Sequence, residues 1–547
     1  MKRVDRGRTL GSLAALLAFG CQTSTTTPST PEDTTAPPID SAVDTQTSPD
    51  TGDRPVDERT CGLQSPDAPL FFLEDDLISF SVACSGSLPT EDADIALLEA
   101  PSGASFEPLT RTFTWPTTGS DGGRFDLTFS VQPIGNTGVP IVETVPVWVA
   151  DNPSAETPVP VDATRYTEEW GLPVMHIESD GFSQSYTPIN VVFYEKSYEA
   201  FGKIRGATSA YYPKPSFTLE FDKDEIEIPA WDSDDRDHLI LLTTFDDNSY
   251  VRQKLVYDQW AAMAEYWGQT RLTPRTFFTV VYINNSYWGL YVGLDRIDNE
   301  YIRQMGFENN DGNLYKAVDH SANFSLYNAS GGLKSSLAEG YTKEEGEPES
   351  DFSDLEALVD FTGNAGPNSL VEGLADWVYP EEFMDWYWLV TYSLAEDSGG
   401  KNSYLYHDPD SGLFRFSPWD FNHSWGQNWY TIRVSAEDDE DMTWANRVFW
   451  AFLSNEDAQE TLWSRLESMQ NDGPFQPAWM TAQLDAYYAL IDRSAARDWA
   501  NWSASYYSYG SWSGSRTSAN DWQDFEGEKA YLYSWIDQRA LYFGLTP

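Results

Sequence analysis

AEDSGGKNSYLYHDPDSGLFRFSPWDFNHSWG, residues 395–426, is the stretch that decides the fold of the C-terminal half of the chain. An apolar, helical run ends at Leu394, and the loop after it carries Asp397 and Asn402. Two strand-like runs, SYLYH and LFRFSP, flank the turn DPDSG and predict a β-hairpin that leads into Asp420. Because a hairpin folds back on itself, we expect Asp420 to return to Asp397 and Asn402.

These three polar residues form a set that suits phosphoryl transfer. That reaction needs a carboxylate that receives the proton of the acceptor hydroxyl, and oxygen ligands that hold Mg²⁺ against the phosphates of a nucleotide. Asp397 and Asn402 have the spacing of Asp and Asn in the catalytic loop of protein kinases, and Asp420-Phe421 is similar to the metal-binding Asp-Phe-Gly. Either motif alone occurs by chance in acidic chains. Their order, loop setting and intervening hairpin together favour the functional interpretation.

Segments upstream of this stretch add a resemblance to a known family. In chain order they are GKIRGATSAYYPKPSFTLEF, HLILLTTFDDNSYVRQKLVYD, VYINNSYWGLYVGLDRID and NLYKAVDHSANFSL, followed by AEDSGGKNSYLYHD and FSPWDFNHSWG. Over residues 170–430 the chain resembles the spore-coat protein H (CotH) kinases, which are atypical, secreted or surface-associated relatives of protein kinases. The resemblance implies a two-lobed, protein-kinase-like α+β domain that uses ATP with Mg²⁺ or Mn²⁺. In it, Asp397 is the catalytic carboxylate, and Asn402 and Asp420 are metal ligands.

The same resemblance places the phosphates of the nucleotide against a small β-rich lobe. Lys214, which lies at the start of the predicted strand in PKPSFTLEF, is the candidate for the lysine that contacts them. Arg205 could also bind phosphate through its guanidinium, and Lys401 and Lys316 are competing contacts. Lys214 and Arg205 could each instead pair with one of the many carboxylates. Where the family has Glu this chain has Asp295, and that departure puts the role of Asp295 in doubt.

A smaller β-rich part is expected before this domain. Over residues 60–152, short strand-like runs alternate with turn residues, a pattern typical of a β-sandwich. The order PSGASFEP, LTRTFTWPTT, GGRFDLTFSV and PVWVADN resembles the Ig-like and cadherin-like modules of bacterial surface proteins. After a Pro-rich linker, residues 160–547 are expected to form one large domain. The predicted fold is therefore a small all-β, Ig-like sandwich followed by a CotH-type, kinase-like α+β domain.

The N-terminus has the features of an exported lipoprotein. Residues 1–21 combine basic residues, an apolar run too short to span a bilayer, and Cys21 in a sequence that resembles a lipobox. Residues 22–59 are rich in Thr, Ser, Pro and Asp and predict a disordered stalk. If Cys21 is lipidated, Cys61 and Cys84 remain as one possible disulfide, with two free buried thiols as the alternative.

Composition excludes several classes of protein. The net charge of -52, from 86 acidic and 34 basic residues, argues against binding to nucleic acid. A hydrophobic content of 41% argues against a disordered acidic polymer. The five His are scattered and no CxxC pair is present, which argues against a zinc site.

Together these features predict a kinase, lipid-anchored to the cell envelope or cell surface, that transfers the γ-phosphoryl group of ATP to Ser or Thr of an extracytoplasmic protein. The membrane would be contacted only through the lipid anchor, and the protein substrate would lie in the envelope or outside the cell. Because ATP is scarce there, a catalytically silent pseudokinase or adhesin is the alternative, and a structural envelope protein is a third hypothesis. The presence of Asp397, Asn402 and Asp420 favours catalysis.

Overall fold

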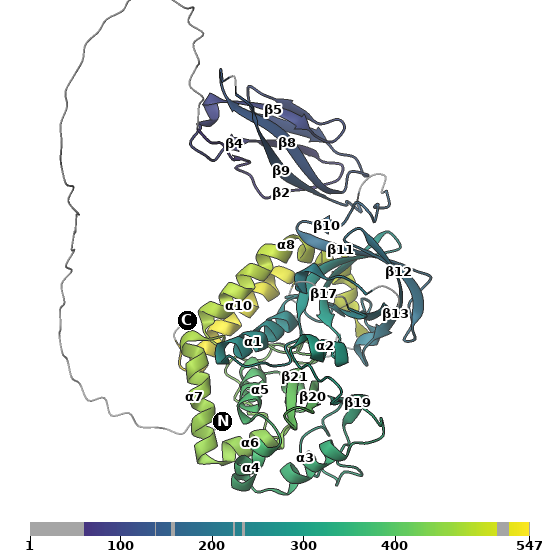
Figure 1. Ribbon diagram of the computed structural model, residues 1–547, viewed down its shortest axis with the longest axis vertical. Coiled ribbons are helices and arrows are strands. Elements are labelled where there is room, and N and C mark those ends of the chain that lie inside the picture. The colour runs from purple at the N-terminus through teal and green to yellow at the C-terminus, as the bar shows by residue number, and fades with distance from the viewer. Residues whose placement is uncertain are drawn as a thin grey trace, which may run out of the picture.

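The computed structural model describes residues 59–545 apart from 137, 155–158, 222–224, 232–235 and 511–523. The expected signal peptide, the lipidation site Cys21 and the predicted stalk up to residue 58 lie outside the described residues. Within them the protein is a mixed α+β structure (Figure 1). It consists of a β-sandwich, a β-barrel and a mainly helical part with a small sheet, which confirms the predicted mixed class.

The N-terminal sandwich packs two sheets face to face around one core. Alternate residues of its strands point inward, as Ile78 and Phe80 do in β3, because successive side chains of a strand face opposite sides. Trp115 lies at the centre of this core and contacts the ring of Phe125 edge to face. One sheet has the order β2 (Leu70–Leu73), β9 (Ile141–Ala150), β8 (Gly123–Pro133), β5 (Ala93–Glu99), and the other β3 (Leu77–Ser81), β7 (Thr112–Pro116), β6 (Ser105–Glu107).

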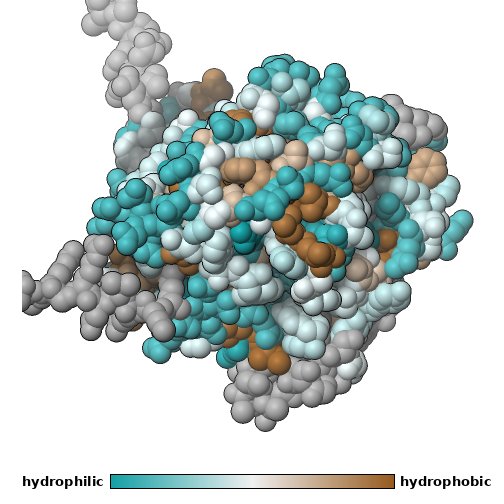
Figure 2. Space-filling view, turned by 90° about the horizontal axis from the view of Figure 1, so that it is seen from below, coloured by the Kyte–Doolittle hydropathy of each residue, from teal (hydrophilic) through white to brown (hydrophobic). Residues whose placement is uncertain are grey.

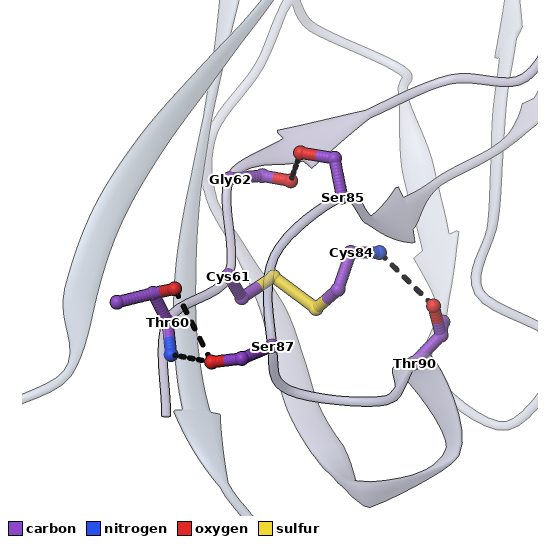
Figure 3. Close-up of a disulfide and its surroundings, with 7 residues drawn as sticks. All are labelled: Thr60, Cys61, Gly62, Cys84, Ser85, Ser87 and Thr90. Atoms are coloured by element: carbon purple, nitrogen blue, oxygen red, sulfur yellow. Dashed lines mark hydrogen bonds between the residues drawn. A yellow bond between two sulfur atoms is a disulfide. The ribbon is translucent and has the colours of Figure 1, made fainter. Parts of the chain in front are cut away.

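A disulfide closes the start of the sandwich (Figure 3). The bond expected between Cys61 and Cys84 is present, with the two Cα atoms 4.9 Å apart. It lies beside a short antiparallel pair, β1 (Leu63–Gln64) and β4 (Ala83–Cys84). The amide of Cys84 donates a hydrogen bond to the hydroxyl of Thr90 at 3.0 Å. These contacts fix the beginning of the described chain to the body of the sandwich.

The next part is a closed barrel of seven strands. Its first strand, β11, pairs antiparallel with β12 and also parallel with β16, so the sheet has no free edge within the ring. The short β10 (Glu168–Glu169) pairs with the start of β11. Around the ring the strands are β11 (Leu172–Ser179), β12 (Thr187–Phe193), β13 (Lys196–Arg205), β14 (Ser216–Glu220), β15 (His238–Thr243), β17 (Ser286–Asp295) and β16 (Thr276–Ile283).

Strands β14 to β17 of this barrel are buried on both faces, which explains their continuous apolar runs, whereas β12 and β13 alternate buried and exposed residues. In β15, Leu239 and Leu241 point into the barrel core, whereas Ile240 and Leu242 belong to the larger core outside it. The outer core is formed with helix α1 (Arg252–Trp267) and with helices from the C-terminal end of the chain. A strand buried on both faces needs apolar residues at every position, not at alternate ones.

The helical part contains a four-stranded sheet of order β19 (Tyr341–Glu345), β18 (Asn313–Ala317), β20 (Ser403–Asp408), β21 (Leu413–Pro418). In Figure 1 the long helices α8 and α10 run side by side along the barrel. None of the described helices is long and apolar enough to cross a bilayer. The face shown in Figure 2 is mostly hydrophilic, with small hydrophobic patches. The helices are α2 (Asn299–Gln304), α3 (Ser353–Asn364), α4 (Pro367–Gly373), α5 (Pro380–Ser393), α6 (Arg447–Ser454), α7 (Glu456–Asp472), α8 (Pro477–Ser508) and α10 (Phe525–Tyr542).

An arginine on α8 joins the sandwich to the barrel. The guanidinium of Arg497 contacts Asp151, just after the last sandwich strand, at 2.8 Å and Glu169 of β10 at 2.5 Å. Tyr282 of the barrel donates its hydroxyl hydrogen to Asp151. Burial raises the pKa of Glu169, and the Arg497 charge opposes this shift. The two parts are therefore joined by a buried, charged contact and not only by the chain between them.

Candidate active site

The hairpin of β20 and β21 brings together the residues at its two open ends. Ser403 and Pro418 are paired, and the amide of Trp419 donates a hydrogen bond to the carbonyl of Asn402 at 3.1 Å. Asp420 therefore lies beside Asn402, although the two are separated by the whole hairpin. This confirms the return of the chain that the strand and turn pattern predicts.

Asn402 connects the two acids. Its side-chain amide nitrogen donates to Oδ2 of Asp397 at 3.3 Å and lies 3.5 Å from the backbone carbonyl of Asp420. Asp397 reaches this place because α5 ends at Leu394 in a left-handed conformation (φ 53°) and a short 3-10 turn, Glu396–Ser398, follows. The structure thus gathers Asp397, Asn402 and Asp420 at one point.

Two of these residues have an uncommon backbone conformation. Asn402 has φ 57° and Asp420 has φ 58°, in the left-handed region that non-glycine residues seldom occupy. Neighbouring groups hold both in place: the amide of Asn402 donates to the carbonyl of Ala317 at 3.1 Å, and the amide of Asp420 donates to the hydroxyl of Tyr257 at 3.2 Å. Local strain of this kind is common where side chains must be aimed for function.

Asp397 has two cationic or hydrogen-bonding neighbours. Nζ of Lys401 lies 2.8 Å from one carboxylate oxygen, and Nε2 of His320 lies 3.1 Å from the other. Partial burial works against ionisation, but the bond from His320 and the Lys401 ammonium together hold the pKa of Asp397 at about 2. Lys401 is therefore a partner of Asp397, and the phosphate contact predicted for it stays a prediction. His320 was not identified as a site residue from the sequence.

Asp420 faces a small polar cavity of about 50 Å³. The protein around this cavity desolvates the carboxylate and raises its pKa; His423 opposes this shift, while the Asp246 and Asp397 charges add to it. The negative charges of Asp246 and Asp397 thus act on the Asp420 carboxylate. The cavity is lined by Arg205, Gly206, Ser209, Ser216, Leu242, Thr243, Asp246, Gln253, Trp419, Asp420 and Asn422.

Two cations lie on the Trp419 side of the cavity. The guanidinium of Arg205, at the end of β13, is 5.0 Å from the centre of the Trp419 ring, and Nζ of Lys316 in β18 is 5.5 Å from the same ring. Burial lowers the pKa of Lys316 to about 8, and repulsion from Arg205 adds to the shift. Among the described residues neither cation has a carboxylate oxygen within 4.0 Å. Arg205 was a predicted phosphate contact, and Lys316 a competing one.

The ammonium group of Lys214 has no hydrogen left to donate to a phosphate. Its buried ammonium lies 2.6 Å from Oδ1 of Asp498 on α8, 2.6 Å from the carbonyl of Leu290 and 2.9 Å from the hydroxyl of Thr244. These partners use all three ammonium hydrogens. Desolvation lowers the pKa of Lys214, and Asp498 opposes the shift. The phosphate contact predicted for Lys214 is replaced by an internal ion pair that fastens α8 to the barrel.

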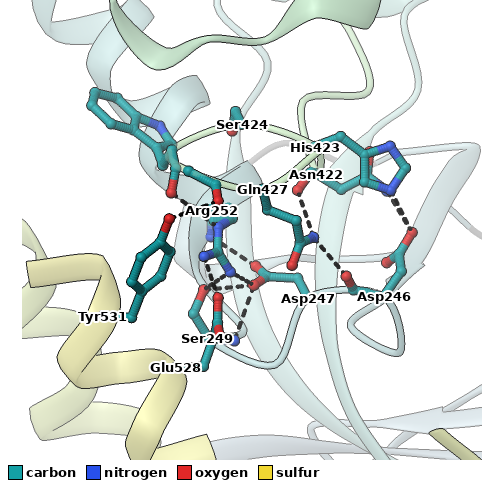
Figure 4. A network of polar contacts seen from close by, with 12 residues as sticks. Asp246, Asp247, Ser249, Arg252, Asn422, His423, Ser424, Gln427, Glu528 and Tyr531 are labelled. Carbon is teal, nitrogen blue, oxygen red and sulfur yellow. Dashed lines mark hydrogen bonds and ion pairs between the residues drawn. The ribbon is translucent and has the colours of Figure 1, made fainter. Parts of the chain in front are cut away.

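A buried arginine fixes the loops on both sides of the cavity (Figure 4). Arg252 lies 2.6 Å from Asp247 and 2.5 Å from Glu528 of α10, and its Nε donates to the carbonyl of Trp425 at 3.4 Å. Nearby, the side-chain amide of Gln427 donates to the carbonyl of Asp246 at 2.7 Å. The loop that follows Asp420 is therefore held to the loop that precedes α1 and to the C-terminal helix.

Two other groups of charged residues do not join this site. Asp295, whose role the sequence leaves in doubt, is fully buried and pairs with Arg275 at 2.9 Å. Asp237, His238 and Asp298 have ligand atoms within 4.8 Å of one another, a spacing that would suit a metal ion. A cation is already present there, because Arg236 lies 3.3 Å from Asp298. We assign no metal to that cluster.

Comparisons with known proteins agree with the resemblance seen in the sequence. A family model described as CotH kinase protein matches residues 203–543. Inner spore coat protein H of Bacillus subtilis (strain 168) is 29% identical over 195 residues, which are 35% of this chain and 51% of that protein. The chain thus spans about half the length of this curated relative. Among solved structures, endo-fucoidan hydrolase MfFcnA4 from glycoside hydrolase family 107 covers 30% of this chain and 27% of its own, at 13% identity and a TM-score of 0.14, which is too low for any argument.

Proposed function

The chain belongs to the CotH kinase protein family, and from that premise we propose that it transfers the γ-phosphoryl group of ATP to a Ser or Thr hydroxyl of an extracytoplasmic protein. The observation that carries the proposal is the meeting of Asp397, Asn402 and Asp420 at the open end of the β20–β21 hairpin, where Asp420 also lines a small cavity. Arg205 and Lys316 lie near it and supply positive charge for phosphate.

The residues present fit a divalent cation and a nucleotide. Mg²⁺ and Mn²⁺ prefer carboxylate and amide oxygens, and Asp420 and Asn402 offer one of each. Since the amide nitrogen of Asn402 is directed to Asp397 and the Asp420 carbonyl, its Oδ1 is left as an acceptor. When bound, the metal would offset the negative charge that develops on the transferred group.

Asp397 is in position to receive the substrate hydroxyl. Its low pKa keeps it ionised at neutral pH, so it accepts the hydroxyl hydrogen bond and orients the oxygen toward phosphorus. In the transfer, the hydroxyl oxygen bonds to the γ-phosphorus, the bond to the β-phosphate oxygen breaks, and the hydroxyl proton passes to Asp397. ADP and the phosphorylated protein are the products.

The finer architecture and the location belong to the same proposal. We take the described sandwich as an Ig-like spacer (residues 60–152) and residues 160–547 as a two-lobed, kinase-like domain, the barrel being the phosphate-side lobe. Export through a lipoprotein signal, with Cys21 as the lipid-bearing residue, would place the protein in the envelope or at the cell surface. The name of the Bacillus relative, a spore coat protein, supports export.

Labelled ATP tests the proposal. The full chain is incubated with γ-labelled ATP and either Mg²⁺ or Mn²⁺, and both self-labelling and metal-dependent ATP binding are measured. We expect both in the wild type and neither in Asp420→Asn, whereas Asp410→Asn, an exposed acid in the turn of the same hairpin, should match the wild type. A wild type that neither labels itself nor binds ATP would favour the silent binding module. Full activity in Asp420→Asn would refute the site assignment.

The affinity for ATP should also depend on pH through Lys316. Below its pKa of about 8 the ammonium is charged, and above that value the charge is lost, so affinity is expected to fall as the pH rises. A charge-assisted phosphate contact contributes roughly 1.5 kcal/mol, which corresponds to about a tenfold loss across the transition. Calorimetry with MgATP between about pH 7 and pH 10 measures it.

Two variants separate Lys316 from other titrating groups. Lys316→Arg should keep high affinity across the whole range, because a guanidinium stays charged. Lys316→Met should bind weakly at every pH. Equal pH profiles for the wild type and Lys316→Met would show that Lys316 does not contact the nucleotide.

A further inference from the structure

A second carboxylate, Asp246, faces the cavity of Asp420. It lies in the loop between β15 and α1 and is 1% exposed. Its Oδ2 accepts hydrogen bonds from Asn422 at 2.5 Å and from the hydroxyl of Tyr212 at 3.1 Å, and lies 3.6 Å from Nε2 of His423. Its Oδ1 has no hydrogen-bond partner among the described residues. Figure 4 shows Asn422 and His423 on one side of this carboxylate.

An oxygen of a buried carboxylate without a partner is costly, and native proteins seldom leave one so. Here the cost is increased by Asp420, an exposed acid that lines the same cavity, because the two negative charges repel each other. Arg205 also lines the cavity, but no ion pair between it and either acid lies within 4.0 Å among the described residues. A cation between the two carboxylates would satisfy both.

The surroundings of Asp246 hold its position firmly. Asn422 and Tyr212 fix one oxygen, and the backbone carbonyl accepts from Gln427. Such contacts orient a ligand before the metal arrives, as the outer residues of metal sites commonly do. Oδ1 is therefore a fixed oxygen without a partner among the described residues, on a side chain that lines the same cavity as Asp420.

We propose that Asp246 is a further ligand of the divalent cation, binding it through Oδ1 opposite Asp420. The inference rests on the proposed function, because the metal is the one that would accompany ATP. It adds to Asp420 and Asn402 a carboxylate from a different segment of the chain. A metal bound this way would join the loop before α1 to the loop after β21.

A simpler role for Asp246 is to serve as the counter-ion of His423. The two roles predict opposite effects of removing the imidazole. If Asp246 only holds His423, then His423→Gln and Asp246→Asn should disturb the cavity alike. If Asp246 is a ligand, His423→Gln should not weaken metal binding, because His423 lies near Oδ2 and the metal would bind Oδ1.

Titration with Mn²⁺ alone, without nucleotide, distinguishes the metal-ligand role of Asp246 from its role as counter-ion of His423. Free Mn²⁺ is followed by electron paramagnetic resonance on the full chain, at low ratios of metal to protein. Weak binding to the many surface acids is then common to every variant. The matched control is Asp258→Asn, since Asp258 is a partly buried acid on α1 that pairs with Lys254 at 2.9 Å and does not line the cavity.

We expect Asp246→Asn to weaken the tightest Mn²⁺ site at least about tenfold, Asp420→Asn to do the same, and Asp258→Asn and His423→Gln not to weaken it. Unchanged affinity in Asp246→Asn, or equal losses in Asp246→Asn and His423→Gln, would overturn the inference. Should Asp246→Asn fail to fold, the His423→Gln result decides alone. If Mn²⁺ binds and only Asp420→Asn loses it, the proposed function stands while this inference fails. Absence of a tight site in the wild type also refutes this inference, whereas the proposed function fails only if self-labelling and ATP binding are absent as well.

Discussion

Replacing Asp397 with Asn is expected to reduce the rate of phosphoryl transfer by about a thousandfold while changing the affinity for ATP little. The substitution keeps the shape of the side chain but removes the negative charge that receives the hydroxyl proton, and loss of a general base costs about 10²–10⁴ in rate. Asn402 and Asp420, which hold the metal in our proposal, remain in place.

Single-turnover labelling gives the rate of the chemical step, and equilibrium binding of ATP gives the affinity. His320→Gln is the matched comparison, since it removes a partner of Asp397 at 3.1 Å and leaves the carboxylate itself. It should reduce the rate far less than Asp397→Asn does. A rate in Asp397→Asn within about threefold of the wild type would exclude Asp397 as the base.

Replacing Arg252 with Met should lower the free energy of unfolding by about 3–5 kcal/mol. Arg252 is fully buried between Asp247 and Glu528, so its loss leaves two acids in the interior with fewer compensating contacts. Arg433, 3.0 Å from Glu528, relieves part of that cost and favours the lower end of the range. Urea denaturation measures the change.

Arg303→Met provides the control, because Arg303 is an exposed arginine whose pair with Glu300 spans 3.5 Å. Its loss should cost less than about 1 kcal/mol. Because Arg252 also binds the carbonyl of Trp425, the variant should bind metal less well even where it is folded. Equal stability of the two variants would show that the buried network contributes little.

The features that local sequence encodes were predicted well. The hairpin that returns Asp420 to Asn402 follows from two alternating strands and a turn, which are signals within a few residues of one another. Helix α1 begins at Arg252, whose backbone amide donates a hydrogen bond to the carboxylate of Asp247 five residues earlier, which is again a contact between residues close in sequence.

The features that depend on distant partners were not predicted. Lys214 looked available for phosphate, yet its partner Asp498 lies 284 residues further along the chain. Closure of the barrel depends on the parallel pairing of β11 with β16, which no local sequence pattern predicts. The same holds for Asp246, which lies beside Asn422 and His423 only in the folded chain. Contacts of this kind come from tertiary packing and not from periodicity or turn chemistry.

The closed ring of strands has a further consequence for a protein that we place outside the cell. A sheet with an open edge offers unpaired backbone groups to which a strand of a neighbouring molecule can add, and so starts fibrous aggregates. Copies crowded together on one envelope would meet such edges often. Since β11 is bonded on both sides, the barrel gives an adjacent copy no strand to extend, and edge strands remain only in the other, open sheets of the described residues.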